Sequence, residues 1–436
     1  MGLMTTVAIR AADLATWASR KTGRGSGGMI GGMVANFLDP KLMEQLGGSR
    51  PCVIVTGTNG KSTTTRMLAE AIRSLGTVAT NEGGDNMDAG VISALLAGRH
   101  ADRIVLEVDE LHVPAIVEKL DASVLVLLNL SRDQLDRVGE INKIEQVLRA
   151  AVAKRPDMTI IANCDDVQVT SVAWDCPNVV WVSAGVGFTG DSTSCPRTGG
   201  AVVRTENADG TPDWYAVKKL PDGREFRRPT PTWTIDAEGL TTPDGEQLPM
   251  TLKLPGNANR GNATQAIAAA VALGVDENQA LAAAERVDDV AGRYSTVTFE
   301  GREIHLLLAK NPAGWQEALS MVDTAAVGLV IAVNGQVGDG VDLSWLWDVR
   351  FESFEGVSVF ASGERAADLS VRLTYAGIEH VLEPDPLAAI RRCPPGRVEV
   401  LANYTALRDL NRAISAAGYS SADAESNGTA NGKAQA

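Results

Sequence analysis

Short, mostly apolar runs follow one another along the chain from residue 51, separated by amphipathic stretches. We expect strands at Cys52–Val55, Ile104–Val108, Val124–Asn129 and Met158–Ala162, and helices between them, such as Ser62–Leu75. Strands that are apolar on both faces are typical of parallel sheets, because helices cover both sides of such a sheet. This alternation of strand and helix therefore predicts an α/β fold built on a parallel sheet.

The same alternation returns after about residue 294. Strands are expected near Ile304–Leu308, Leu329–Val333, Val357–Ala361 and Val398–Leu401. We interpret residues 294–419 as a second, Rossmann-like α/β domain, which follows a central domain at residues 49–293.

Residues 189–235 depart from this rhythm. They are polar, rich in Gly, Pro and charge, and contain hairpin-type turns at Asp209-Gly210 and Asp222-Gly223. We interpret this segment as an insertion of hairpins into the central domain.

The two ends of the chain have their own patterns. Val7, Ala11, Leu14 and Trp17 recur at helical spacing, and the Gly-rich stretch GRGSGGMIGG follows at residues 23–32. That stretch is interpreted as a linker, with contact to a phosphate as the alternative. Residues 1–48 thus form a helical and Gly-rich segment, and residues 420–436, rich in Ala, Ser, Asn and Gly, are expected to be disordered.

Charge and composition exclude several classes of protein. The net charge of −14 and pI near 4.9 argue against a nucleic-acid binder and against general electrostatic attraction to anionic lipid. Five scattered cysteines suit a reducing compartment rather than a disulfide framework. No apolar run approaches the length that spans a bilayer. We expect a cytoplasmic protein that is not integral to the membrane, with transient contact at its inner face as a further possibility.

The stretch CVIVTGTNGKSTTT at residues 52–65 is typical of a phosphate-binding loop between a strand and a helix. Gly57 and Gly60 permit tight turns, Lys61 supplies a cation for phosphates, and Ser62 supplies a hydroxyl for Mg²⁺. The spacing is shorter than G-x-x-x-x-G-K-[ST], because Val55 stands where the first Gly is usual. An ordinary strand-turn-helix is the alternative, but the motif predicts binding of ATP or a similar nucleotide.

Glu107 ends the predicted strand RIVLEVDE, where a carboxylate would face the bound nucleotide. An acid at a strand end is often simply solvated. Beside a phosphate loop, it is instead expected to be a Mg²⁺ ligand.

These motifs resemble those of the Mur ligases, the ATP-dependent enzymes that extend the peptidoglycan stem peptide. TGTNGKSTT resembles their phosphate loop, and LPGNANRGNATQAIAAAVALG at residues 254–274 resembles their G-x-x-N-x-x-N segment. The resemblance implies that Asn259 and Asn262 lie near adenine and that Arg293, in AGRY, reaches ATP from the hinge. The nucleotide-binding residues are then Thr58, Asn59, Gly60, Lys61, Ser62, Thr63, Asn259, Asn262 and Arg293, with Ser62 and Glu107 as Mg²⁺ ligands.

Further segments resemble one branch of that family, the MurT synthetase subunits of lipid II isoglutaminyl synthase. They are NEGGDNM (81–87), EVDE (107–110), NLSRDQLDRVGEI (129–141), AKNPAGW (309–315), DGVDLSWLWD (339–348) and NYTAL (403–407). The resemblance implies ATP-dependent amidation of the D-glutamate α-carboxylate in the lipid II stem peptide to D-isoglutamine. It also implies that ammonia comes from a GatD-type glutaminase in a heterodimer.

The loop DGVDLSWLWD has two interpretations. From the residues alone, Asp342 caps a short helix that begins near Ser344. The resemblance instead implies that Asp342 completes the Cys/His site of the glutaminase partner as its third, carboxylate member. On that interpretation Trp345 and Trp347 anchor the interface or support the loop, Asp339 is a turn residue, and Asp348 is solvated.

The sequence also departs from the MurT pattern. MurT subunits often carry a four-cysteine zinc ribbon, but SCPRTGG at residues 194–200 retains only Cys195, and Thr198 stands at the second ligand position. We expect no zinc, because one thiol cannot form a tetrahedral site. Amino-acid-adding ligases carry Asp-Tyr-Ala-His before Asn-Pro, but here Leu307-Leu-Ala-Lys precedes Asn311-Pro312. They also tend to carry Asp-His where this chain has Asp133-Gln134, and both changes agree with the MurT branch.

Two other functions stay open. An amino-acid-adding Mur-type or folylpolyglutamate-type ligase would share the nucleotide site, although it would not need the DGVDLSW loop. A non-catalytic nucleotide-binding regulator would share it as well.

Overall fold

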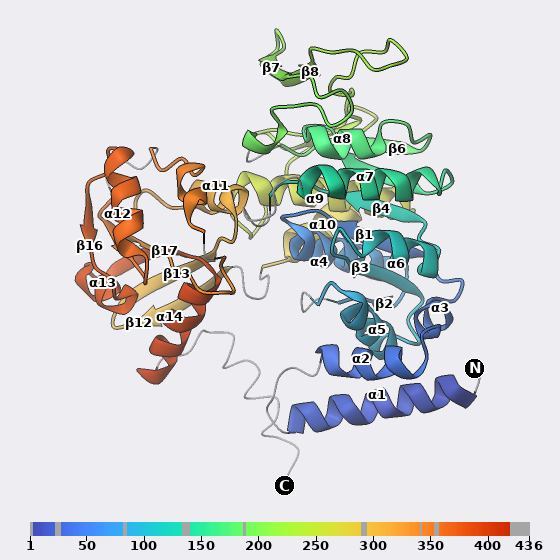
Figure 1. Cartoon of the computed structure of the whole chain (residues 1–436), viewed down its shortest axis with the longest axis horizontal. Coiled ribbons are helices and arrows are strands. Elements are labelled where there is room, and N and C mark those ends of the chain that lie inside the picture. The colour runs from blue at the N-terminus through green and yellow to red at the C-terminus, as the bar shows by residue number, and fades with distance from the viewer. Residues whose placement is uncertain are drawn as a thin grey trace. The chain divides into compact units, whose positions relative to one another are not determined.

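The computed structural model describes residues 3–21, 28–81, 85–132, 140–185, 189–288, 294–340, 342–352 and 357–418. Two compact units divide the chain (Figure 1). The first comprises Met1–Ser131 and Gly139–Asp288, and the second comprises Arg132–Val138 and Asp289–Ala436.

A nine-stranded sheet forms the centre of the first unit, in the order β11-β10-β9-β6-β5-β4-β1-β3-β2. In this sheet the strands β2, β3, β1, β4, β5, β6 and β9 each run parallel to their neighbours. Strands β10 and β11 are added in antiparallel orientation at one edge. Their bounds are β1 Cys52–Thr56, β2 Val78–Ala79, β3 Arg103–Glu107, β4 Val124–Leu127, β5 Thr159–Asn163, β6 Val179–Ser183, β9 Trp233–Ile235, β10 Leu240–Thr241 and β11 Gln247–Leu248.

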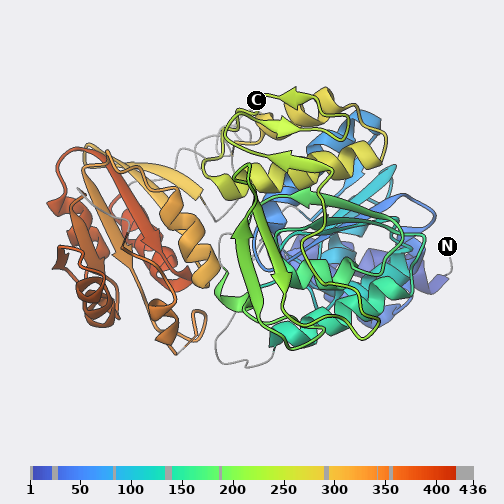
Figure 2. The ribbon, with the colours of Figure 1, turned by 90° about the horizontal axis from the view of Figure 1, so that it is seen from above.

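Helices cover both faces of this sheet (Figure 2). Helices α4, α9 and α10 pack together on one face, and α6, α7 and α8 lie on the other, over a core of strand residues such as Ile54 and Leu106. The bounds are α1 Leu3–Lys21, α2 Gly28–Leu38, α3 Leu42–Gly47, α4 Lys61–Ile72, η1 Arg73–Leu75, α5 Asp88–Ala97, α6 Val113–Leu120, α7 Glu140–Ala153, α8 Val167–Ala173, η2 Gly190–Ser192, α9 Asn257–Ala272 and α10 Glu277–Arg286.

The predicted insertion contains a separate two-stranded sheet, β7 Val202–Glu206 with β8 Pro212–Ala216. Gly210 and Gly223 have positive φ, as the turns at Asp209-Gly210 and Asp222-Gly223 require. The segment has its own small apolar core, which includes Trp214 and Phe226. Its last residues, by contrast, belong to β9 and join the main sheet.

The second unit contains a six-stranded sheet in the order β12-β13-β17-β14-β15-β16, parallel except between β12 and β13. One apolar core lies under α11, η3 and α12, and a second lies under α13 and α14 on the opposite face. The bounds are β12 Tyr294–Phe299, β13 Arg302–Leu308, β14 Gly328–Ala332, β15 Val359–Ser362, β16 His380–Leu382, β17 Gly396–Ala402, α11 Pro312–Ser320, η3 Ser344–Trp347, α12 Ala366–Tyr375, α13 Pro386–Arg392 and α14 Tyr404–Ala416.

The α/β fold predicted from the apolar runs is confirmed in both units, and each predicted strand is present within a residue or two. The strand predicted at Val124–Asn129 ends early, at Leu127, because Asn129 turns toward the phosphate loop. Within the described residues, no helix combines the length and the apolar character that crossing a membrane would need.

Candidate functional site

The turn from β1 to α4 is shaped by two glycines that other residues could not replace without strain. Gly57 and Gly60 have φ of 139° and 84°. A Cβ at Gly57 would lie 2.9 Å from the carbonyl oxygen of Asn129, and one at Gly60 would lie 2.4 Å from Oδ1 of Asn262. The loop therefore needs glycine for both backbone conformation and close approach of its neighbours.

Helix α4 begins at Lys61 directly after this turn, with Gly60 as its N-cap and no side-chain cap. The first N–H groups of any helix lack an intrahelical acceptor and carry the positive end of the helix dipole. Those of Lys61, Ser62 and Thr63 thus form, together with the loop, a site suited to phosphate oxygens.

Asn129, which follows β4, holds the outer part of the loop. Its Oδ1 accepts from the Asn59 N–H at 2.9 Å, and its Nδ2 donates to the Asn59 carbonyl at 3.0 Å. Its carbonyl oxygen accepts from the Thr58 N–H at 2.9 Å, and the Thr58 hydroxyl donates to the Ser131 carbonyl at 3.1 Å. The residue types in the sequence did not identify Asn129 as a site residue, since a polar residue after a strand usually indicates only a turn.

The Lys61 ammonium lies under the loop and is mostly buried. It donates to the carbonyl oxygens of Gly57 at 2.6 Å and Thr58 at 3.3 Å, and Glu110 Oε1 lies 3.7 Å away. These contacts fix a positive charge at the predicted phosphate position.

Glu107 ends β3, and in the parallel register it pairs with Val55 of β1, immediately before the loop. Its side chain is 2% exposed, and Asn86 Nδ2 donates to its Oε1 at 3.1 Å. Its Oε2 is buried and, within the described residues, has no hydrogen-bond partner. Such an oxygen destabilises the fold unless a cation or donor meets it, so the carboxylate fits a Mg²⁺ ion held near the phosphates.

Helix α9 brings the two predicted asparagines to this loop. Asn262 and Asn259 are both buried, and Asn262 lies against Gly60. Asn259 Nδ2 donates to the Pro255 carbonyl at 2.7 Å, while Gln265 Nε2 ties the helix to β4 through the Leu127 carbonyl at 2.9 Å. Their position beside adenine stays a prediction. Arg293 lies outside the described residues.

The substitution Gly60→Ala is expected to weaken ATP binding by at least about tenfold, because it adds both backbone strain and a clash with Asn262. Titration calorimetry with ATP measures this. Gly210→Ala is the matched control, since Gly210 has nearly the same φ, 80° against 84°, but has open space around it. Equal affinity in the two variants would contradict this account of the loop.

In the second unit, Asp342 is exposed at the start of η3. Its Oδ1 accepts from the Ser344 N–H at 2.8 Å, which makes an Asx turn just before η3. The N-cap position of η3 is instead occupied by Leu343 and has no side-chain cap, so the cap expected at Asp342 from the residues alone is not formed. Asp339 is more than a turn residue, because its Oδ1 accepts from the Thr405 N–H at 2.9 Å and ties the loop to α14.

The two tryptophans of this loop differ in their environments. Trp345 is 5% exposed and stacks on Trp315, with ring centroids 5.4 Å apart. Trp347 is 55% exposed and meets the exposed ring of Tyr375 edge-on at 5.3 Å. Trp345 therefore supports the loop, and Trp347 is available on the surface.

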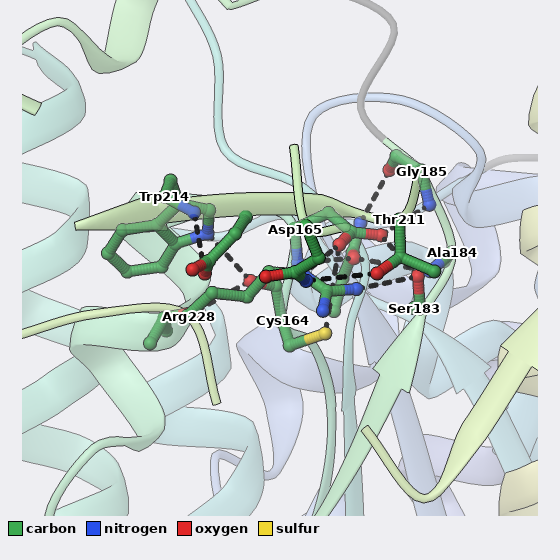
Figure 3. Close-up of polar contacts among 12 residues, drawn as sticks. Cys164, Asp165, Ser183, Ala184, Gly185, Thr211, Trp214 and Arg228 are labelled. Atoms are coloured by element: carbon green, nitrogen blue, oxygen red, sulfur yellow. Dashed lines mark hydrogen bonds and ion pairs between the residues drawn. The ribbon is translucent and has the colours of Figure 1, made fainter. Parts of the chain in front are cut away.

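The insertion has one cysteine where a zinc ribbon has four. A buried ion pair connects it to the turn that follows β5 of the main sheet (Figure 3). Arg228 Nε donates to Asp165 Oδ1 at 2.7 Å, and Asp165 Oδ2 accepts from Ser183 Oγ at 3.0 Å. Burial disfavours the charged guanidinium, but Asp165 outweighs this and raises the pKa of Arg228. Cys195 is buried in the small apolar core of the segment.

Replacing Arg228 by methionine is expected to destabilise the first unit by about 3 kcal/mol, because it leaves the buried Asp165 carboxylate without the cation that balances its charge. Urea unfolding measures the loss, and hydrogen exchange is expected to rise in the insertion. Arg224→Met, at an exposed ion pair of the same segment, is the control and should change little. A similar effect of the two substitutions would contradict a special role for the buried pair.

Comparison with known proteins adds to this geometry. Residues 55–187 match the Mur ligase middle domain, and residues 308–407 match the MurT ligase C-terminal domain. The lipid II isoglutaminyl synthase (glutamine-hydrolyzing) subunit MurT of Streptococcus pneumoniae is 27% identical over 95% of this chain and 98% of its own length. The subunit of the same name from Staphylococcus aureus is also 27% identical, over 93% of this chain and 98% of its own.

Solved structures agree on the fold. A pseudomurein peptide ligase type C from Methanothermus fervidus superimposes with a TM-score of 0.65 at 17% identity, covering 85% of this chain and 79% of its own. MurF from Acinetobacter baumannii gives a TM-score of 0.60 at 17% identity, covering 87% of this chain and 80% of its own.

Proposed function

The chain belongs to the MurT branch of the Mur ligase family, and on this premise we propose that it is the ATP-using synthetase subunit of a lipid II isoglutaminyl synthase. It amidates the α-carboxylate of D-glutamate in the lipid II stem peptide, with ammonia supplied by a GatD-type glutaminase. We place the protein in the cytoplasm, in transient contact with the inner face of the membrane, where its lipid-linked substrate is accessible.

The observation that carries this proposal is the juxtaposition of the phosphate loop with Glu107. In the first step, a substrate carboxylate oxygen attacks the γ-phosphorus of ATP and ADP leaves. Lys61 and the first N–H groups of α4 hold the phosphates, while Ser62 and Glu107 are the residues that would hold Mg²⁺. Bound Mg²⁺ would supply charge neutralisation during this transfer.

The second step makes the amide bond. Ammonia attacks the acyl carbon of the phosphorylated substrate, phosphate leaves with the bonding pair, and the nitrogen loses a proton. The second unit supports this reaction rather than amino-acid addition, because residues 308–407 match the MurT C-terminal domain. Asp342, exposed in this unit, is proposed to orient the imidazolium of the glutaminase partner.

A mass-spectrometric assay with lipid II, ATP and Mg²⁺ tests the proposal. We expect amidation from ammonium at high pH by this chain alone, and amidation from glutamine only when a candidate glutaminase is added. Addition of an amino acid in place of ammonia would instead indicate a ligase. Lack of turnover under every condition would favour the nucleotide-binding regulator.

A further inference from the structure

The large apolar side chains of helix α1 are exposed, whereas a helix that only contributes to a core would bury them. Leu14 is 64% exposed and Trp17 is 57% exposed. The residues that α1 buries are small or polar: Thr5, Ala8, Ala12 and Ser19. The helical spacing of apolar residues seen in the sequence therefore marks the outer face of α1 and not its packed face.

Helix α2 is arranged in the same way. Phe37 is 87% exposed, and Met33 and Ile30, one and two turns before it, are exposed as well. The packed side consists of Gly31, Gly32 and Ala35. Large apolar residues thus line the outer side of both helices, and we call this set the outer face: Met4, Val7, Leu14, Trp17, Ile30, Met33 and Phe37.

Close packing on the small-residue side leaves no room to turn these side chains inward. A Cβ at Gly31 would lie 2.2 Å from Thr16 Oγ1 of α1, and one at Gly32 would lie 1.8 Å from the Ala89 carbonyl oxygen of α5. The Thr5 hydroxyl also donates to Asp39 at 2.9 Å. The orientation of both helices is therefore fixed by specific contacts, and an exposed apolar patch of this kind usually marks an interaction surface.

The local charge indicates the nature of the partner. Residues 1–41 contain five Lys or Arg and two Asp or Glu, which gives this segment a net charge of +3. Because the whole chain has a net charge of −14, residues 42–436 carry a net charge of −17. Arg10, Lys21 and Lys41 are exposed in the described part of this segment. Apolar and aromatic side chains flanked by basic residues are the pattern of helices that lie in the interface of an anionic bilayer.

We propose that the outer face of α1 and α2 docks on the surface of a lipid bilayer that contains anionic lipid. The whole-chain charge argues only against general electrostatic attraction, whereas this contact is local. A second copy of the chain would also cover apolar side chains, but the positive charge would then face itself. The tail at residues 420–436 is a poor cover, because it contains no large apolar residue.

The proposed function gives this contact a purpose, and to that extent the inference rests on it. Helix α2 packs on α5, where the Gly32 N–H donates to Ser93 Oγ at 2.9 Å. Helix α5 begins at Asp88, just after Asn86, whose amide holds Glu107. Helix α2 is therefore connected to the candidate metal site through one helix, α5, and docking would bring the head group of a lipid-linked substrate toward that site.

Vesicle co-sedimentation of the full chain tests the proposal. We expect binding to phosphatidylglycerol/phosphatidylcholine vesicles, and a partition coefficient at least about tenfold lower for Leu14→Gln/Trp17→Gln/Phe37→Gln. Val371→Gln, an exposed apolar residue of α12, is the matched control and should bind as the unaltered protein does. Arg10→Gln/Lys21→Gln should lose the preference for anionic over neutral vesicles. Thermal melting confirms that each variant is folded.

Three outcomes would overturn the proposal: no binding by the unaltered protein, equal binding by the triple variant, or a dimer in light scattering that the triple variant abolishes without any vesicle binding. Amidation of a water-soluble, short-chain lipid II analogue by the unaltered protein reports the proposed function separately. Failure there with intact vesicle binding would reject the reaction and keep the docking surface.

Discussion

Glu107→Gln is expected to lower amidation about 10³-fold, with glutamine or ammonium as nitrogen source, because it removes a metal-binding charge worth several kcal/mol in phosphoryl transfer. The substitution keeps the shape of the side chain, and its Oε1 can still accept from Asn86. Steady-state assays at saturating ATP over a range of Mg²⁺ concentrations measure the loss.

Stability gives a second readout that separates function from folding. Because Glu107 Oε2 is buried without a partner among the described residues, removal of its charge should leave the melting temperature unchanged or raised. The extra stabilisation that ATP and Mg²⁺ give the unaltered protein should be lost.

Glu118→Gln, at an exposed acid on α6, is the control and should behave as the unaltered protein does. Activity within tenfold of normal for Glu107→Gln would remove Glu107 from the metal site. A regulator without catalysis would instead keep its effect on the partner when the variant still binds nucleotide.

The strands and the phosphate loop could be predicted because the information is local. An apolar run, two glycines and Lys61-Ser62 occupy neighbouring positions, and backbone geometry follows from them directly. The position of Glu107 beside the loop could also be predicted, because the carboxyl ends of neighbouring parallel strands meet at one edge of the sheet, while its role as a Mg²⁺ ligand stays a prediction. The unpartnered Oε2, however, depends on what surrounds it and is not a property of the sequence pattern.

Contacts between distant positions could not be predicted in this way. Asn129 braces a loop 70 positions earlier, and Arg228 pairs with an aspartate 63 positions earlier. Both look like ordinary polar residues after a strand or near a turn. The sequence likewise could not predict which face of α1 is packed, because helical spacing identifies an apolar face but does not show what covers it.

Asp342→Asn is expected to lower glutamine-dependent amidation about 10³-fold in the complex with the glutaminase, while amidation from ammonium is retained. An asparagine Oδ1 can still accept from the Ser344 N–H, so the turn before η3 is kept and only the negative charge is lost. This design separates a structural role of Asp342 from a role toward the partner, because an Asx turn tolerates asparagine well but a partner for an imidazolium does not.

Asp348, expected to be solvated, instead pairs with Arg132 at 3.2 Å in a partly exposed ion pair. Asp348→Asn removes a charge from the same loop and only this weak pair, so it is the control and should retain both activities. Co-purification with the partner shows that the complex still forms. Equal loss of both activities in Asp342→Asn would indicate damage to the synthetase itself, and retention of both would leave Asp342 with only its structural contact in the turn before η3. Selective loss of the glutamine reaction is the outcome that only a carboxylate acting on the partner's imidazole predicts, since the ATP site of the first unit is untouched.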